Sequence, residues 1–378
     1  MFYRVLILCL ALVLTACSHN APVSVSYPQP AIHSIAQARV KNIILMIGDG
    51  MGAEHRKLAR LTRASESNGL AMDTLQIRGE VRTASAGGAI TDSAASATAM
   101  ATGHKTRNGV IGLDPDLNHL SNIIEAARAK GKATGLVTTT QITHATPAAF
   151  AAHSASRKNM LEIAHQMSLA DIDVMMGGGG IYFLPEDKSD CYQQAGKRQK
   201  GDDLIEMLQS SGYFYICSEK ALRALNIKSV ERVLGLFAGE DMLRPFMPDL
   251  ALMTQKSIAV LSENAQGFFL MVEGGQIDWA SHDNEAEKVI ESLRGFDKAV
   301  KVARDFALST DDTLIIVTAD HETGGLQINR HEGDIGPFLD YQGEKFFLHW
   351  STSRHTGVNV PLTASGPMSV KLLRRTTS

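Results

Sequence analysis

The chain has 378 residues, of which 44% are hydrophobic and 20% charged, and its formal net charge is −3. This length is enough for one large domain or two ordinary ones, and the composition is typical of a globular protein. A chain without a basic surplus attracts polyanions weakly, so we expect no specific binding of nucleic acid.

The first sixteen residues have the pattern of an export signal. Arg4 supplies a positive charge, and residues 5–14 form an apolar run that is too short to span a membrane. We therefore assign residues 1–16 to a signal peptide and expect no element of the fold there.

The end of this signal, LTAC at 14–17, resembles the lipobox of bacterial lipoproteins. In that family the signal is cut before the cysteine, which then carries the lipid, so the resemblance implies lipidation of Cys17. Ser18 follows, whereas the usual signal for retention in the inner membrane is an aspartate. For a Gram-negative source this implies an exported protein on the periplasmic face of the outer membrane, bound only by its lipid. An ordinary signal with a coincidental cysteine is the alternative.

Residues 17–40 read as a tether between the lipid and a folded domain. Pro22, Pro28 and Pro30 lie among small and polar residues without an apolar period. We place one domain at 41–378, since no internal repeat and no second boundary is visible.

Strand and helix patterns alternate through this domain. Short apolar runs predict buried strands at 42–47, 133–138, 172–176, 268–272 and 314–318. Helical patterns lie at 121–130, 158–169, 202–209, 250–261 and 285–307. This order predicts an α/β fold with a large, mostly parallel central sheet and helices on both faces.

The polar segment 185–200 is predicted to be a surface loop. It contains Cys191, and Cys217 lies further along the chain. In an oxidising compartment the two would form a disulfide that closes a surface excursion. Two independent buried thiols are an equal alternative, because spacing alone does not show proximity.

The stretch TDSAASAT at 91–98 predicts a sharp turn into a tightly packed helix. It places Asp92 or Ser93 at the N-terminal boundary, where the first amides have no internal partners. The helix dipole favours negative charge there, so Ser93 could be held as an alkoxide or a phosphoester. An ordinary capping serine on an Ala-rich helix is the alternative.

Acidic and histidine residues recur at the ends of the predicted strands. They are Asp49, Glu273, Asp278, His282, Asp320, His321 and, further on, His355. Carboxylates with imidazoles are the ligands of zinc, and carboxylates with a hydroxyl suit magnesium. Each residue alone could be a cap or a turn residue, but the carboxyl ends of parallel strands meet at one crevice.

These motifs resemble the alkaline phosphatase family from residue 41 to about 367. They are TDSAASAT at 91–98, GHKT at 103–106 with NG at 108–109, TTT at 138–140 leading to HATP at 144–147, EGGQID at 273–278, TADHETGG at 318–325 and HTG at 355–357. The resemblance implies a three-layer α/β sandwich and metal-dependent hydrolysis of small phosphate monoesters through a phosphoserine. It also implies two Zn²⁺ and one Mg²⁺.

The resemblance also assigns roles to individual residues. Ser93 matches the nucleophile, Arg157 the group that clamps phosphate, and Asp92 the carboxylate that orients Arg157. The metal ligands would be Asp278, His282 and His355 for the first zinc, Asp49, Asp320 and His321 for the second, and Asp49, Thr146 and Glu273 for magnesium. The turn at 322–325 is expected to shape the second zinc site.

Elementary chemistry agrees with these roles. A serine hydroxyl is a weak nucleophile that needs a metal or a base, and no histidine lies near Ser93 in sequence. Zinc lowers the pKa of a bound water to about 7, which supplies the second step. Arg157 offers a planar fork suited to two phosphate oxygens.

Two positions depart from some family members and affect substrate or product binding. His144 stands where certain bacterial enzymes carry an aspartate beside the magnesium site, and Trp279 stands where others carry lysine or histidine. The affinity for magnesium and the retention of phosphate are therefore open. The segment between His321 and His355 is too short for the crown-like insertion of larger members, which leaves a homodimer open as well.

Two alternative functions remain. A phosphodiesterase or sulfatase of the wider superfamily would share the metal core, but Ser93 lacks the Cys/Ser-x-Pro-x-Arg setting of a sulfatase. A non-catalytic, metal-binding surface lipoprotein is the other, although no catalytic position is missing.

Overall fold

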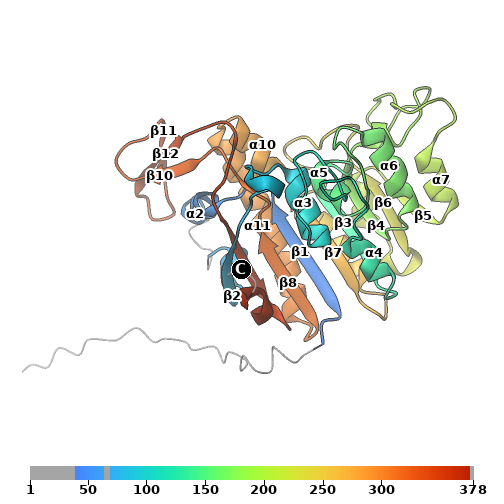
Figure 1. The fold of residues 1–378 in the computed structure, drawn as a ribbon, viewed down its shortest axis with the longest axis horizontal. Helices are drawn as coiled ribbons and strands as arrows, with labels where there is room; N and C mark the ends of the chain where they lie inside the picture. Colours follow the sequence, from blue (N-terminus) through green and yellow to red (C-terminus); the bar gives the residue numbers. More distant parts are fainter. Residues whose placement is uncertain (1–38, 64–68, 375–378) are drawn as a thin grey trace, which may run out of the picture. The chain divides into compact units, whose positions relative to one another are not determined.

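A nine-stranded sheet forms the centre of the computed structural model (Figure 1), which describes residues 39–63 and 69–374. Its strand order is β2 (Ile77–Val81), β14 (Val360–Ser365), β8 (Thr313–Thr318), β1 (Asn42–Gly48), β7 (Phe268–Gly274), β3 (Ala133–Gln141), β4 (Val174–Gly178), β6 (Arg232–Leu236) and β5 (Tyr213–Ile216). Strand β14 runs antiparallel to both of its neighbours, and the other neighbouring strands are parallel. The predicted large, mostly parallel sheet is confirmed.

The predicted signal peptide, Cys17 and the tether as far as residue 38 lie outside the described residues. Within the described ranges, no helix combines the length and the apolar character needed to cross a membrane.

The central strands are continuous apolar runs because both faces of the sheet are covered. Every residue of β7 is buried, and β7 pairs with β1 on one side and β3 on the other. Strand β1 alternates between two cores: Ile44 and Met46 belong to one, and Ile47 belongs to the other. Period-two alternation between two covered faces is what a three-layer sandwich requires.

The helices divide between the two faces of the sheet (Figure 1). Their bounds are α2 (Ala53–Leu61), α3 (Ser93–Thr102), α4 (Ile123–Arg128), α5 (Ala145–Ala149), α6 (Met160–Leu169), α7 (Leu204–Ser210), α8 (Glu219–Ala224), α9 (Leu250–Leu261), α10 (Gln276–His282) and α11 (Ala286–Leu308). Helices α2, α9 and α11 contribute to the core with Ile44, whereas α3 to α7 contribute to the core with Ile47. Helix α11 buries Val289, Leu293 and Phe296, which follow the 3.6-residue period.

Several predicted bounds are corrected by local contacts. The helix expected at 121–130 is limited to α4, because Asn122 caps it and Glu125 returns a bond to the Asn122 amide. Strand β3 continues to Gln141 instead of ending at residue 138, and β4 begins at Val174 instead of residue 172.

A small antiparallel sheet of β10 (Leu326–Asn329), β12 (Lys345–Trp350) and β11 (Ile335–Leu339) lies between His321 and His355. The two-residue strands β9 (Glu322–Thr323) and β13 (His355–Thr356) pair directly beside it in sequence. Strands this short carry no readable sequence period, so the sequence does not predict them. Their pairing brings His355 back toward His321.

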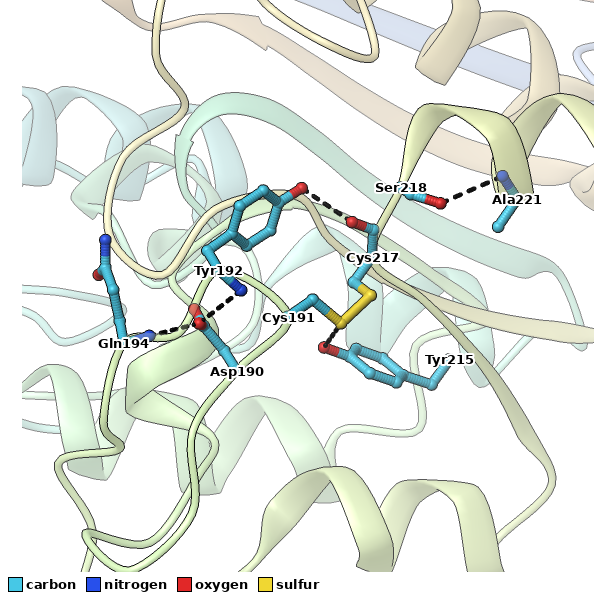
Figure 2. The surroundings of a disulfide bond; sticks show 8 residues. All are labelled: Asp190, Cys191, Tyr192, Gln194, Tyr215, Cys217, Ser218 and Ala221. Carbon is cyan, nitrogen blue, oxygen red and sulfur yellow. Dashed lines mark hydrogen bonds between the residues drawn. A yellow bond between two sulfur atoms is a disulfide. The ribbon is translucent and has the colours of Figure 1, made fainter.

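Residues 185–200 contain no helix or strand, as predicted, but the segment is not wholly on the surface, since Asp190 and Arg198 are buried. Figure 2 shows Cys191 and Cys217 joined in a disulfide, with Cα atoms 6.3 Å apart. Tyr192 Oη donates to the Cys217 carbonyl at 2.8 Å. The structure therefore favours the disulfide over two separate thiols.

We expect the double variant Cys191→Ser/Cys217→Ser to have a free energy of unfolding about 3 kcal/mol lower, because the bond closes a long loop in the unfolded chain. Urea unfolding at 25 °C measures the difference, and the circular dichroism of the native state should not change. A reductant should lower the melting temperature of the unaltered protein and leave that of the variant unchanged. Equal stability of both proteins would contradict a structural bond here.

Candidate active site

Three neighbouring strands carry acidic residues to one edge of the sheet. Asp49 follows β1 directly, Glu273 is the sixth residue of β7, and Asp320 lies two residues after β8. The register aligns Ile47 of β1 with Glu273 on one side and with Thr318 on the other. The carboxylates thus lie at the same edge, as the strand pattern predicts.

The turn after β1 depends on a glycine. Gly50 has a φ of +72°, and a Cβ atom there would lie 2.8 Å from the Cα of Asp278 and 2.9 Å from Thr323 Oγ1. Its amide donates to Asp320 Oδ1 at 3.1 Å. Only glycine allows the Asp49 turn to pack this closely against the other two loops.

Asp49, Asp320 and His321 form a fully buried group that we call the Ser93 cluster. Its centre is His321 Nε2, which lies 3.5 Å from Asp49 Oδ1 and 3.2 Å from Asp320 Oδ2. Ser93 Oγ lies 3.3 Å from the same nitrogen. The sequence places no histidine near Ser93, but the fold places His321 there.

The protonation of His321 follows from its other nitrogen. The hydroxyl of Thr323 donates to Asp278 Oδ1, so its oxygen accepts from His321 Nδ1 at 3.2 Å. The proton therefore sits on Nδ1, and Nε2 presents a lone pair to two carboxylates. Burial also lowers the pKa of His321, which keeps the ring neutral. The Nε2 lone pair and the carboxylates repel each other unless a proton or a metal ion lies between them.

Asp278, His282 and His355 form a second group, the Asp278 cluster. Asp278 and His282 share one face of α10 at a spacing of four residues, and Asp278 Oδ2 lies 3.3 Å from His282 Nε2. His355 Nε2 lies 3.0 Å from His282 Nε2 and 3.5 Å from Asp278 Oδ1.

Backbone carbonyls fix the orientation of both histidines in the Asp278 cluster. His282 Nδ1 lies 2.7 Å from the Ser353 carbonyl, and His355 Nδ1 lies 2.9 Å from the Thr91 carbonyl. Each Nδ1 must donate, so the two Nε2 atoms face each other and need a proton or a metal ion between them. In the metal-free protein a proton is favoured, since hydrogen bonding to Asp278 raises the pKa of His282 to about 9. A metal would displace it.

A third group combines Asp49, Glu273 and His144, with Thr146 on the neighbouring α5. Glu273 Oε2 accepts from Thr138 Oγ1, whereas its Oε1 and the hydroxyl of Thr146 are buried without a hydrogen-bond partner. Burial raises the pKa of Glu273 to about 7. Oxygen atoms left in this state are the ligands that a hard cation such as Mg²⁺ takes.

Unpaired buried oxygen atoms show that these groups fit cations. Both carboxylate oxygens of Asp49 and Oδ2 of Asp320 have no hydrogen-bond partner. Burial first, and then the neighbouring carboxylates, raises the pKa of Asp49 well above its usual range. Ligands about 2.0–2.1 Å from a tetrahedral zinc lie about 3.3–3.4 Å apart. The spacings of 3.0–3.5 Å in the Ser93 and Asp278 clusters agree with that geometry.

Asp92 has two roles that use different oxygen atoms. Its Oδ1 caps α3 by accepting from the Ala95 amide at 3.0 Å. Its Oδ2 accepts from Arg157 Nη1 at 3.1 Å and from the Gly109 amide at 2.9 Å. The sequence leaves the helix boundary open between Asp92 and Ser93, and the structure places the cap at Asp92.

His144 holds the other side of Arg157. Arg157 Nη2 lies 3.0 Å from His144 Nε2, and because a guanidinium only donates, this nitrogen must accept. The proton is then on Nδ1, which is buried without a partner and belongs to the third group. Burial, followed by the charge of Arg157, lowers the pKa of His144 to about 3. Trp279 packs edge-on against this ring, with centroids 5.6 Å apart.

Two of the three groups that orient the histidine ligands, the backbone carbonyls of Ser353 and Thr91, are not predicted by the sequence. Thr323, the Ser353 carbonyl and the Thr91 carbonyl hold the three histidine rings. The turn at 322–325 was expected to shape the second zinc site, and Thr323 in it contacts both His321 and Asp278. Backbone carbonyls have no sequence signal, so only the fold reveals them.

The fold and the three ligand groups together define a metal-binding α/β protein with a serine at its centre. Residues 40–348 match the family model described as alkaline phosphatase. Alkaline phosphatase 4 of Bacillus subtilis is 38% identical over 312 residues, which are 77% of this chain and 63% of that protein. The human tissue-nonspecific isozyme is 32% identical over 329 residues, or 74% and 63%.

A solved structure gives the same result. The alkaline phosphatase of the Antarctic bacterium TAB5 superposes with a TM-score of 0.74 at 32% identity, covering 87% of this chain and 92% of that one. The chain belongs to the alkaline phosphatase family. It spans 63% of the length of the Bacillus and human relatives.

The metal-free protein should lose stability as the pH rises, because of Glu273. Its pKa is raised from 4.5 to about 7, so the stabilising proton is fully bound below pH 4.5 and lost as the pH rises through 7. Relative to Glu273→Gln, the free energy of unfolding should fall by about 3 kcal/mol between pH 4.5 and 7.5.

Urea unfolding in the presence of a chelator, repeated across this pH range, measures the difference. Glu332→Gln, which alters an exposed carboxylate, serves as the matched control and should follow the unaltered protein. A gap between the unaltered protein and Glu273→Gln that does not vary with pH would refute the role of burial.

Proposed function

We propose that this chain hydrolyses phosphate monoesters through a phosphoserine formed on Ser93. One observation supports this most strongly: Ser93 Oγ, at the first turn of α3, faces the unpaired ligands of the Ser93 cluster. Arg157 is held near the same helix start by Asp92. Nucleophile, cation ligands and an oxyanion clamp therefore meet at one point.

We further propose three cations: one Zn²⁺ in the Ser93 cluster, one Zn²⁺ in the Asp278 cluster and one Mg²⁺ in the third group. When bound, these cations would acidify the serine and a water and neutralise charge on the reacting phosphoryl group. The protein itself orients the histidine ligands. Thr323, through His321, keeps a lone pair aimed at the Ser93 cluster, and the carbonyls of Ser353 and Thr91 do the same for the Asp278 cluster.

The chain itself binds and orients the phosphate. Arg157 keeps a planar fork of donors in place because Asp92 and His144 each accept one bond from it. The first amides of α3 and the helix dipole favour an anion next to Ser93. Trp279, packed on His144, gives that side of the site an apolar edge.

Hydrolysis of phosphate diesters is the competing function within the same fold. Arg157 presents a two-donor fork that suits two unesterified phosphate oxygens. A monoester offers a third such oxygen and a second negative charge to the cation ligands beside Ser93, whereas a diester offers neither. The combination of Arg157 with these ligands therefore favours monoesters.

We expect Ser93→Ala to lower kcat for p-nitrophenyl phosphate by at least about a thousandfold, because the covalent step loses its nucleophile. The unaltered protein should cleave this monoester faster than the bis ester. Ser96→Ala, three residues along the same helix, is the matched control and should keep most activity, since Ser96 Oγ donates to the Asp320 carbonyl and not toward His321. Full activity of Ser93→Ala, or cleavage of the bis ester faster than that of the monoester, would contradict the proposal.

The third group can be compared with a magnesium site of a solved relative. Variants of the TAB5 enzyme with one histidine replaced by glutamate or aspartate are described with magnesium in the M3 site. In this chain His144 presents an N–H to the third group, and an N–H cannot ligate a metal.

His144→Asp should therefore raise the affinity for Mg²⁺ by about tenfold or more, since a carboxylate adds a charged oxygen ligand. Isothermal titration with Mg²⁺ after loading with Zn²⁺ measures the change. His104→Asp adds the same charge at an exposed position and should leave the affinity as it was. If both variants bind Mg²⁺ like the unaltered protein, His144 does not limit the third site.

Export and lipid anchoring through Cys17 remain part of the proposal. The LTAC motif at 14–17 supports them, together with the disulfide between Cys191 and Cys217, since disulfides persist in oxidising compartments such as the periplasm.

A further inference from the structure

A fourth group of metal-ligating side chains lies outside the candidate active site. It consists of His119, Glu125 and His153, which come from three separate segments of the chain. His119 forms an isolated antiparallel bridge with Leu113, Glu125 is in the first turn of α4, and His153 lies in the loop that leads to Arg157. None of these residues has a role in the proposed reaction.

The two distances from the Glu125 carboxylate to the imidazole nitrogens match those of the candidate zinc clusters. Glu125 Oε1 lies 3.0 Å from His153 Nε2 and 3.5 Å from His119 Nε2. The corresponding distances in the Ser93 and Asp278 clusters range from 3.0 to 3.5 Å. The two imidazole rings lie against each other with centroids 3.8 Å apart.

Hydrogen bonding fixes the direction of two of the three ligands. His153 Nδ1 lies 2.7 Å from the Gly112 carbonyl and must donate to it, so Nε2 points at Glu125. Glu125 Oε2 is occupied by the Asn122 amide at 3.1 Å, which leaves Oε1 for the histidines. Gln166 binds both the amide and the carbonyl of His153 and holds the loop in place.

Both ring nitrogens of His153 face acceptors. Gly112 O and Glu125 Oε1 are both acceptors, so the space between His153 Nε2 and the carboxylate holds either a proton or a metal ion. Two imidazoles and one carboxylate are a ligand set that zinc takes in proteins, often with a fourth position open to water. His119 is exposed over more than half of its side chain, so the fourth position faces solvent.

The geometry points to a second kind of zinc site, separate from the candidate active site, formed by His119, Glu125 and His153. A Zn²⁺ ion there would join α4 to the loop that carries Arg157. That loop is already tied to the 109–111 segment, because Ser154 pairs with Ile111 and the Arg157 amide donates to Gly109 at 2.8 Å. The site would thus brace the arginine that contacts Asp92 without contacting the substrate.

Metal content tests the site without relying on activity. The full protein and each variant are equilibrated with buffered Zn²⁺, and bound zinc is counted by mass spectrometry of the metal. Glu125→Gln keeps the capping contact to Asn122 through its amide oxygen and removes the charge. His119→Ala removes an exposed ring and leaves the hydrogen bonds of His153 untouched. Each variant should bind one zinc fewer than the unaltered protein, with affinity at this site at least about tenfold weaker.

His331→Ala, an exposed histidine before β11, is the matched control and should lose no zinc. Addition of Zn²⁺ should also raise the melting temperature of the unaltered protein more than that of either variant. Equal zinc content in the unaltered protein, Glu125→Gln and His119→Ala would overturn the proposal. This outcome is distinct from failure of the proposed phosphatase function, because Ser93→Ala leaves the His119 group intact.

Discussion

Four buried carboxylates at the carboxyl edge of β8, β1 and β7 set the main physical constraint on this structure. Asp49, Glu273, Asp278 and Asp320 are each at most 4% exposed. Among the described residues, no lysine or arginine lies within ion-pair distance of any of them. Buried charges without partners cost several kcal/mol each, so protons or metal ions must neutralise this edge. The adjacent histidines turn their Nε2 atoms toward these carboxylates, and carboxylates combined with imidazole nitrogens suit metal ions.

The rest of the site follows from where this negative edge lies. The N-terminal end of helix α3, which carries Ser93, points toward these carboxylates. Asp92 and His144 each accept a hydrogen bond from Arg157 and hold it in place. A phosphate placed between Arg157 and metal ions would therefore have positive charge on both sides. The three-layer core makes this possible, since β7 is buried throughout, β1 has no exposed residue, and the ends of two tightly packed strands cannot shift independently.

Much of this arrangement was predictable from the sequence because the signals are local. Continuous apolar runs gave β1 and β7 within two residues, and the recurrence of Asp49, Glu273 and Asp320 after strands predicted a shared edge. The cap at Asp92 follows from the same kind of local pattern.

The remaining features could not be predicted, because they depend on contacts between distant segments. The short pair β9 and β13 brings His355 to His282, and no periodicity marks two-residue strands. The backbone carbonyls of Thr91 and Ser353, which set the histidine tautomers, are chemically the same as every other carbonyl in the sequence. The direction of His144 toward Arg157 also emerges only in three dimensions.

Anomalous X-ray scattering at the zinc absorption edge, from crystals of the zinc-loaded protein, tests most directly whether metal ions neutralise this edge. We expect one zinc peak bounded by Asp49, Asp320 and His321 and another bounded by Asp278, His282 and His355. The absence of a peak within the Ser93 cluster, with Asp49 and Asp320 hydrogen-bonded to protein or water instead, would contradict the account.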